Sequence, residues 1–474
     1  MIRFTLPFPR RPPRRAGAMA LTILLAGCGS VQASRGHDQV AALVADHAGA
    51  PTRWDAGPPP ADRVDAWVRE LLAPGLTRQR AIEIALVNNP ALNETYEHLG
   101  VSQADMVQAG LLRNPTLGID LGFGHSPFDE LRGSIVQDFL DLFVLGHRKD
   151  IARAQFTADT LRVAHQALET AAEVSKAVVE VQVGTALVER RAQALETLAA
   201  DAELTARRFD AGTATELEQA EDKANYEEAR LALEHDRLEL TERRERLNRW
   251  LGLTGPASTW TLRETLAEPA LDARETRDLQ ALALQQRLDV AASAQQAALM
   301  QKAVDLARST RFVGRLEIGV DGHQDPDGPR VIGPNLAIEL PLFDQRQATI
   351  AKLEAERRET ERRHQRLVVD TRSEVRVAEA RLETARLELA QYQRTLLPLR
   401  RSIVALTLQA YNGMFVGAPR LLAAKRAELD ADRGYVDALG AYWIAHAELE
   451  RAVGRRLDVP AASPLTTAQR TTAP

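Results

Sequence analysis

Hydrophobic positions along the chain change their spacing several times, and these changes separate helices from strands. Thr77 precedes an apolar pattern of helical spacing over residues 76–112, which is interrupted near Pro90. Residues 116–123 then alternate between apolar and polar, as in a strand with two different faces. A less regular stretch over 134–142 predicts a second strand.

The next segment predicts a very long helix that turns back on itself. Residues 147–208 contain no proline and one glycine, so a single helix of roughly 60 residues, about 90 Å long, is expected. A break at 210–213 leads into a returning helix over 215–251, which ends at Gly252. The two helices predict an antiparallel hairpin that is much longer than an ordinary globular domain needs.

The same order of elements then recurs in the second part of the chain. A helix is expected over 273–309, strands over 314–321 and 334–343, a very long helix over 346–408 and a returning helix over 420–453. The recurrence indicates a tandem duplication in which each unit consists of two strands and a hairpin.

Single residues support the duplication, because similar residues recur about 200 positions apart. The segments 141–143 and 341–343 correspond at an offset of 200 residues. Pro398 lies inside the second long helix, where it removes a backbone donor, and we expect the helix to bend or loosen there. The pairs with an offset of 202 residues are Phe209 and Tyr411, Lys223 and Lys425, Leu247 and Leu449, and Gly252 and Gly454.

The amino-terminal residues predict export and acylation. Five arginines precede an apolar run over 16–26 that is too short to cross a bilayer as a mature helix, so residues 1–27 predict a signal peptide. The run ends in Leu25-Ala26-Gly27-Cys28, which resembles the lipobox of bacterial lipoproteins, where the cysteine is acylated after cleavage. Cys28 is the only cysteine, so no internal disulfide can form. In this resemblance, Gly29 in place of Asp points to the inner leaflet of the outer membrane.

Four further segments complete the predicted organisation. The proline-rich residues 28–75 are interpreted as a lipid-anchored tether and extended cover. Residues 76–270 and 271–455 form the two repeats, and 456–474 a disordered tail.

Composition and charge narrow the function. Hydrophobic residues make up 45% of the chain but aromatic residues only 5%, which favours long helices. The formal charge of −5 becomes about −10 without the five signal arginines, so a nucleic-acid partner gains no support. Gly-Lys-Ser, Gly-Lys-Thr, His-Glu-x-x-His and Gly-x-Ser-x-Gly motifs are all missing, so we expect no enzyme, and no cofactor besides a covalent lipid on Cys28.

The strands and helices together indicate a pore built from several chains. Each predicted strand has one apolar face, yet an open sheet cannot lie in hydrocarbon because its edge amides lack partners. Bacterial barrels need roughly eight strands or more, so four strands per chain require other subunits. The apolar helix stripes would be buried best against neighbouring hairpins, and a closed ring of hairpins makes a tube.

These features resemble the lipoprotein type of the TolC-like outer membrane factor family over residues 76–455. The resemblance implies a mainly α fold with a small β part: tandem-duplicated helical hairpins form a periplasmic helical barrel, and four strands per chain join a shared trimeric transmembrane β-barrel. The segments that carry it are Leu76-Thr77 to Pro90, Arg208-Phe209-Asp210-Ala211-Gly212, Leu340-Pro341-Leu342-Phe343-Asp344 and Ala410-Tyr411-Asn412.

The resemblance also implies a function and partners. The chain would be the outer membrane channel subunit of a tripartite efflux system, a homotrimer that receives substrates from a periplasmic adaptor and an inner-membrane pump. It would lie in the outer membrane, lipid-anchored, with a large periplasmic part. The alternative is a periplasmic coiled-coil structural or adaptor lipoprotein that does not span the membrane. Two pairs of alternating strands favour the channel.

In this family the hairpin tips narrow the tunnel, so the residues around both breaks are candidates for a gate. Glu218 and Arg420 each lie nine residues beyond a tip aromatic, and we hypothesise that they form a gate ion pair. The alternative is two solvated charges that contribute almost nothing. Arg420 and Ala423 stand where the family often has acids, and Met414 replaces the usual glycine. The candidates are Phe209, Asp210, Gly212, Glu218, Tyr411, Met414 and Arg420.

A metal site has weaker support. His125 and His323 are expected in outward-facing turns between paired strands, and His323 has several aspartates near it in sequence. Solvated polar loops are the alternative. The tip over 411–417 looks like that of family members that work with metal-exporting pumps, so metal ions or drugs are the expected substrates.

Overall fold

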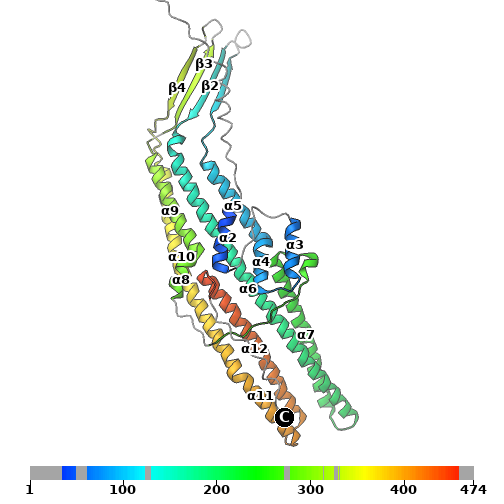
Figure 1. Cartoon of the computed structure of the whole chain (residues 1–474). Coiled ribbons are helices and arrows are strands. Elements are labelled where there is room, and N and C mark those ends of the chain that lie inside the picture. Colours follow the sequence, from blue (N-terminus) through cyan, green and yellow to red (C-terminus); the bar gives the residue numbers. More distant parts are fainter. Residues whose placement is uncertain are drawn as a thin grey trace, which may run out of the picture.

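The structure is a computed structural model, and it describes residues 35–49, 61–122, 130–271, 278–312, 314–324, 329 and 331–457. Cys28 and His125 lie outside the described residues. The molecule is long and narrow, with a sheet at one end and helices that extend away from it to two hairpin tips (Figure 1). Of the helices in the described part of the chain, none combines the length and apolar content that crossing a membrane requires.

The first half follows the predicted order. Thr77 caps α4, because its side chain accepts a hydrogen bond from the Arg80 amide. Asn89 caps α5, with Pro90 at the first helical position, so the predicted interruption near Pro90 is confirmed. The elements are α4 Arg78–Asn88, α5 Pro90–Ala109, β1 Thr116–Gly122, β2 Glu130–Asp138, α6 Leu140–Asp210, α7 Glu216–Leu251 and the short 3-10 turn η1 Gly255–Ser258.

The second half repeats the first. Helices α7 and α12 each contain 36 residues and begin and end 202 positions apart. Both end at a glycine in the left-handed conformation, Gly252 with φ 67° and Gly454 with φ 78°. The elements are α8 Leu279–Gln286, α9 Leu288–Ser309, β3 Leu316–Gln324, β4 Val331–Ile338, α10 Gln347–Gln391, the π-helical turn η2 Tyr392–Leu396, α11 Leu397–Asn412 and α12 Ala418–Val453.

Pro398 loosens the second long helix, as its position predicted. The π turn Tyr392–Leu396 directly precedes α11, and Pro398 cannot donate to the carbonyl one turn back. The turn places the Tyr392 ring against Gly434 of α12, where an added Cβ would overlap the ring. A glycine at this point of α12 therefore allows the two helices to remain packed.

The four strands form one antiparallel sheet in the order β1-β2-β3-β4. Strands β2 and β3 join the two halves, with Ile135 opposite Val320. Strand β2 ends at Asp138 instead of Leu142, and β4 runs over 331–338 instead of 334–343. Pairing with both neighbours fixes the ends of β2, which alternation alone does not show. The helix expected from 273 begins at Leu279 and is interrupted at Arg287.

The expectation of an extended cover over 28–75 is wrong for the described part of that segment. Two helices lie there, α2 Arg35–Ala48 and α3 Ala61–Leu72. Val40 and Val44 of α2 are buried against α4, α5 and α6, and Val68 of α3 joins a second cluster. The neighbouring prolines concealed the helical spacing of these apolar residues.

The predicted disordered tail also begins too early at residue 456. The Arg456 amide donates to the carbonyl of His47 over 3.1 Å, and Leu457 is buried in a hydrophobic cluster. Residues 458–474 lie outside the described part of the chain.

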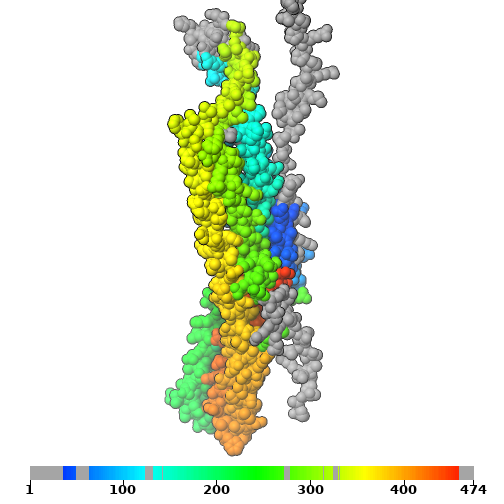
Figure 2. All heavy atoms as spheres, turned by 90° about the vertical axis from the view of Figure 1, so that its left-hand side faces the viewer, coloured from blue at the N-terminus to red at the C-terminus, as the bar shows by residue number. Residues whose placement is uncertain are grey.

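The hydrophobic core is distributed along the molecule in several clusters instead of one centre. Helix α6 packs along both α7 and α12, and α12 packs along α11, so the hairpin helices lie in the order α7, α6, α12, α11. Figure 2 shows how the chain's second half forms one elongated side of the molecule. Helices α7 and α11 are therefore the two outer edges of this layer.

Candidate functional site at the hairpin tips

The first tip is a compact turn between α6 and α7. Gly212 adopts φ 73°, and the Thr213 amide donates to the Arg208 carbonyl over 2.8 Å. The Thr213 hydroxyl donates to the same carbonyl, and the Arg208 guanidinium donates to the Thr213 carbonyl over 3.1 Å. Phe209 is 38% exposed. The turn is held by its own backbone and leaves the aromatic side chain partly open to solvent.

Glu218 has a local role that sequence reasoning missed. The Thr215 amide donates to the Glu218 carboxylate over 2.8 Å, and the Glu218 amide donates to the Thr215 hydroxyl over 3.2 Å, which forms a capping box. The Thr215 backbone hydrogen bond, then that of its side chain, lowers the pKa of Glu218. The sequence Thr-x-x-Glu carries the signal for this box. Within the described chain, no ion pair joins Glu218 to Arg420, so the gate pair stays a hypothesis about contacts between copies.

The second tip exposes apolar side chains. Met414 takes φ 61°, the conformation that a glycine adopts easily, and is 94% exposed. Phe415 is 86% exposed, and Tyr411 is 42% exposed. Helix α12 begins at Ala418, and the preceding Gly417 provides no side-chain cap. Its first turn contains no acid and includes the exposed Arg420. The second tip is therefore more apolar and more basic than the first.

The metal candidates are not brought together in the described part of the chain. His323 lies in β3, opposite Arg132 of β2 and Val331 of β4, and not in the turn where it was expected. No group of three or more His, Cys, Asp or Glu residues that could hold a metal occurs among the described residues.

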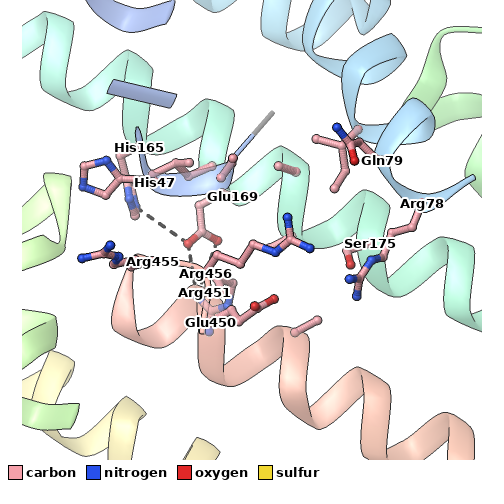
Figure 3. Close-up of a pocket in the computed structure, with 18 of the residues that line it drawn as sticks. His47, Arg78, Gln79, His165, Glu169, Ser175, Glu450, Arg451, Arg455 and Arg456 are labelled. Atoms are coloured by element: carbon pink, nitrogen blue, oxygen red, sulfur yellow. Dashed lines mark hydrogen bonds and ion pairs between the residues drawn. The ribbon is translucent and has the colours of Figure 1, made fainter. Parts of the chain in front are cut away.

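A polar cavity of about 240 Å³ lies where α2, α4 and α6 meet the end of α12 (Figure 3). Glu169 of α6 accepts from the Arg451 guanidinium over 3.3 Å and faces the His165 Nε2 at 3.9 Å. Glu450 accepts from the Leu457 amide over 3.0 Å, and burial raises the pKa of its carboxyl group. Opposite charges from the two halves of the chain therefore meet across this junction.

His446 of α12 lies buried beside this junction. Its side chain is 5% exposed and contacts the rings of Tyr442 and Trp443. Burial, followed by the positive charges of Arg78 and Arg456, lowers the pKa of His446 to about 4. The imidazole is therefore neutral in the folded protein at neutral pH.

Replacing His446 by glutamine should flatten the acid dependence of stability. The folded protein takes up this proton only near pH 4, whereas an unfolded histidine titrates near 6.5. The wild type therefore loses up to about 3 kcal/mol from this group as the pH falls from 6.5 to 4. Thermal unfolding at several pH values in this range measures how steeply stability falls with pH. His235→Gln, at an exposed histidine of α7, should keep the wild-type slope, and an unchanged slope in His446→Gln would contradict the assignment.

Comparison with known families identifies the fold. Residues 81–253, from α4 to the end of α7, match the family model described as outer membrane efflux protein. Over these residues, which lie in the first repeat, the chain is similar to members of this family. Members of the outer membrane efflux protein family are channels of the outer membrane with a large helical periplasmic part. The family resemblance of the sequence and its mainly α fold with a small sheet are confirmed, and the channel is favoured over the periplasmic scaffold.

Solved structures share this fold across most of the chain. A membrane protein from Pseudomonas aeruginosa superposes with a TM-score of 0.67 at 21% identity, covering 80% of this chain and 92% of that one. VceC from Vibrio cholerae gives 0.65 at 18% identity, with 84% and 98% covered. The open state of MtrE from Neisseria gonorrhoeae gives 0.63 at 17% identity, with 80% and 88% covered. At these identities the likeness concerns the fold alone. No curated protein matches the chain in sequence.

Proposed function

We propose that this chain is the channel subunit of a tripartite efflux system and that three copies form one continuous duct. The observation that carries the proposal is that a single chain leaves its sheet open and its outer helices uncovered. Solutes would pass from a periplasmic adaptor and an inner-membrane pump to the exterior without a chemical reaction, and no cofactor would be needed.

The sheet requires other copies because its apolar side chains are exposed and its edges are open. Leu117, Ile119 and Leu336 are each more than 60% exposed, and Phe343 below the sheet is 94% exposed. Strands β1 and β4 each pair with one neighbour in the described chain. Three copies would supply twelve strands, enough to close a barrel in which every edge amide has a partner.

The outer helices require other copies for the same reason. Leu217, Leu231 and Leu238 of α7 repeat at multiples of seven residues and are 61–67% exposed. On α11, exposed apolar residues recur at intervals of four and three residues, at Leu399 and Ile403 and then at Leu406. Both spacings are those of coiled-coil seams. Packing α7 of one copy on α11 of the next buries both seams and closes a head-to-tail ring.

Charge supports the same pairing. The amino-terminal part of α7, residues 216–228, contains six acids and one lysine. Helix α11 contains two arginines and no acid. The acidic face of α7 and the basic face of α11 attract each other, so this pairing between copies is favoured over a pairing of two faces with the same charge.

The lipid and the membrane address belong to the same proposal. Acylation of Cys28 would anchor each copy in the inner leaflet of the outer membrane, beside the barrel. The sequence over residues 25–29 supports this assignment. The sequence of the second tip suggests metal ions as substrates, and drugs are the other expected class.

Single-channel recording from the acylated protein in planar bilayers tests the proposal. We expect stable conductance from trimers that resist detergent until heated. If Glu218 and Arg420 of neighbouring tips hold the gate shut, then Glu218→Gln and Arg420→Ala should both raise the open probability. Glutamine keeps the capping box of α7 and removes only the charge. Glu221→Ala, at an exposed acid one turn further on, is the matched control.

The outcomes separate the channel from its gate. Correctly assembled trimers without conductance would favour a periplasmic scaffold. Conductance that is unchanged in Glu218→Gln and Arg420→Ala would remove the gate pair and leave the channel. If the open probability rose in Glu218→Ala but not in Glu218→Gln, the effect would come from the loss of the α7 cap and not from the loss of the charge.

A further inference from the structure

The two hairpin tips of this chain carry opposite charge although they are copies of one ancestral unit. Residues 397–427 contain five cations and no acid, whereas the equivalent residues 195–225 contain eight acids and three cations. The cations of the second tip are Arg400, Arg401, Arg420, Lys425 and Arg426. The two tips lie at the same end of the molecule, away from the sheet (Figure 1).

Three of the five cations, Arg400, Arg420 and Arg426, have no ion-pair partner in the described chain, although the charge of Arg426 acts on Asp201 of α6. Lys425 binds Glu428 at 2.6 Å, and Arg401 lies 3.6 Å from Asp432, with both acids further up α12. Arg400 and Arg420 are exposed, and no described carboxylate pairs with them. Arg420 also lies in the first turn of α12, where the helix dipole disfavours a cation. Local helix stability therefore does not account for Arg420.

At the first tip two of the three cations, Arg207 and Arg208, have partners. Arg207 pairs with Glu203, and Arg208 donates to the Thr213 carbonyl. The first turn of α7 contains Glu216 and Glu218, which suit the helix dipole. The first tip is therefore an acidic surface whose charges suit the dipole of the helix that begins there. The second tip is a basic surface whose charges do not suit the dipole of α12.

The second hairpin also contains the features that allow a helix to bend. Its ascending helix is interrupted by the π turn over 392–396 and by Pro398, the two features at which helices change direction. Helix α6 of the first hairpin runs for 71 residues without such a break. In a tube of three copies, a hairpin that departs from a straight course can reach across the mouth, while the straight one stays in the wall.

We infer that, in the open duct, where Arg420 is not paired with Glu218 of a neighbouring tip, the second tips of three copies form a cationic ring at the narrow end, and that Arg420 makes this open duct prefer anionic solutes. Rings of arginine or lysine side chains serve anion pores, as acidic rings serve cation pores. The solute class is small inorganic or organic anions. Free metal cations are disfavoured at this ring, in contrast to the substrate suggested by the tip sequence. The inference rests on the proposed function, because it needs the assembled tube.

The test is the reversal potential of single channels under an approximately tenfold gradient of potassium chloride. The wild type should be more permeable to chloride than to potassium, and Arg420→Glu should invert this order. Arg63→Glu makes the same charge change at an exposed site of α3, far from the tips, and should leave the ratio unchanged. The preference should weaken in salt near 1 M, where the screening length falls to about 3 Å.

Failure of the inference can be distinguished from failure of the proposed function. Assembled trimers that do not conduct would overturn both. Conducting channels that prefer potassium, or whose permeability ratio ignores Arg420→Glu, would overturn the cationic ring and leave the channel. Where Arg420→Glu does not assemble into heat-resistant trimers, Arg420→Ala takes its place, and its permeability ratio should move toward one.

Discussion

Replacing Arg287 by alanine should lower the free energy of unfolding by about 3 kcal/mol at neutral pH. The guanidinium is 5% exposed and binds Asp289 through two hydrogen bonds of 3.0 and 2.7 Å. It also donates to Glu374 over 2.5 Å. Alanine would leave the mostly buried Asp289 and the 40%-exposed Glu374 without their cation. Because water reaches Glu374, the expected cost lies at the lower end of the roughly 3–5 kcal/mol that is typical of fully buried pairs. Urea unfolding in detergent, followed by far-UV circular dichroism, measures the loss.

The loss should depend on pH with a definite sign. Burial on its own raises the pKa of Asp289, but hydrogen bonding by Arg287 and the charges of His165 and Arg287 outweigh it, so the pKa is lowered overall. Stability from a lowered carboxyl pKa is present above the unfolded value near 4 and is lost as the pH falls through the folded value. The difference between wild type and Arg287→Ala should therefore be full at pH 7 and shrink below about pH 4.

A surface ion pair between α9 and α10 provides the control for Arg287→Ala. Arg308 pairs with Glu354 on the surface, and Arg308→Ala should leave the unfolding midpoint almost unchanged. A loss in Arg287→Ala no larger than in this control would contradict the assignment. So would a loss that stayed the same from pH 7 to pH 3.

Much of the fold follows from local patterns in the sequence. The break near Pro90, the cap at Thr77 and the glycine at each hairpin end were predictable, because each depends on the backbone geometry of a few neighbouring residues. The duplication was predictable because residues such as Leu247 and Leu449 are buried at equivalent positions and stay alike. Pro398 was predictable because a proline always removes one helical donor.

The features that the sequence did not show depend on distant contacts. Helix α2 is buried by α4, α5 and α6, so its existence depends on surfaces far along the chain. Arg287 has a partner 87 residues away, and no spacing rule connects it to Glu374. The capping box of Glu218, in contrast, depends only on the local Thr-x-x-Glu spacing from Thr215, which the sequence contains. Contacts between the tips of neighbouring copies, which the proposed trimer requires, lie outside a single chain.

Replacing Gly252 by alanine should destabilise the protein by about 3 kcal/mol, through two separate effects. Gly252 has φ 67°, and a left-handed conformation costs a non-glycine residue about 1–2 kcal/mol. The added Cβ would also overlap the carbonyl oxygen of Asn88 and lie 3.1 Å from its carbon. The Asn88 side chain donates to the carbonyls of Leu251 and Gly252 over 2.8 and 3.0 Å, so displacing this residue removes the side-chain donor of both carbonyls at the end of α7.

Gly212 at the first tip is a matched control that separates these effects. It has φ 73°, and nothing lies within 4 Å of the position that its Cβ would take. Gly212→Ala should therefore show only the backbone cost of about 1–2 kcal/mol in the same urea measurement. The additional loss of unfolding free energy in Gly252→Ala then measures how much the contact between the end of α7 and the α4–α5 break contributes to stability. Equal losses in the two variants would show that α7 can shift away from Asn88 without cost, and that the glycine serves the turn alone.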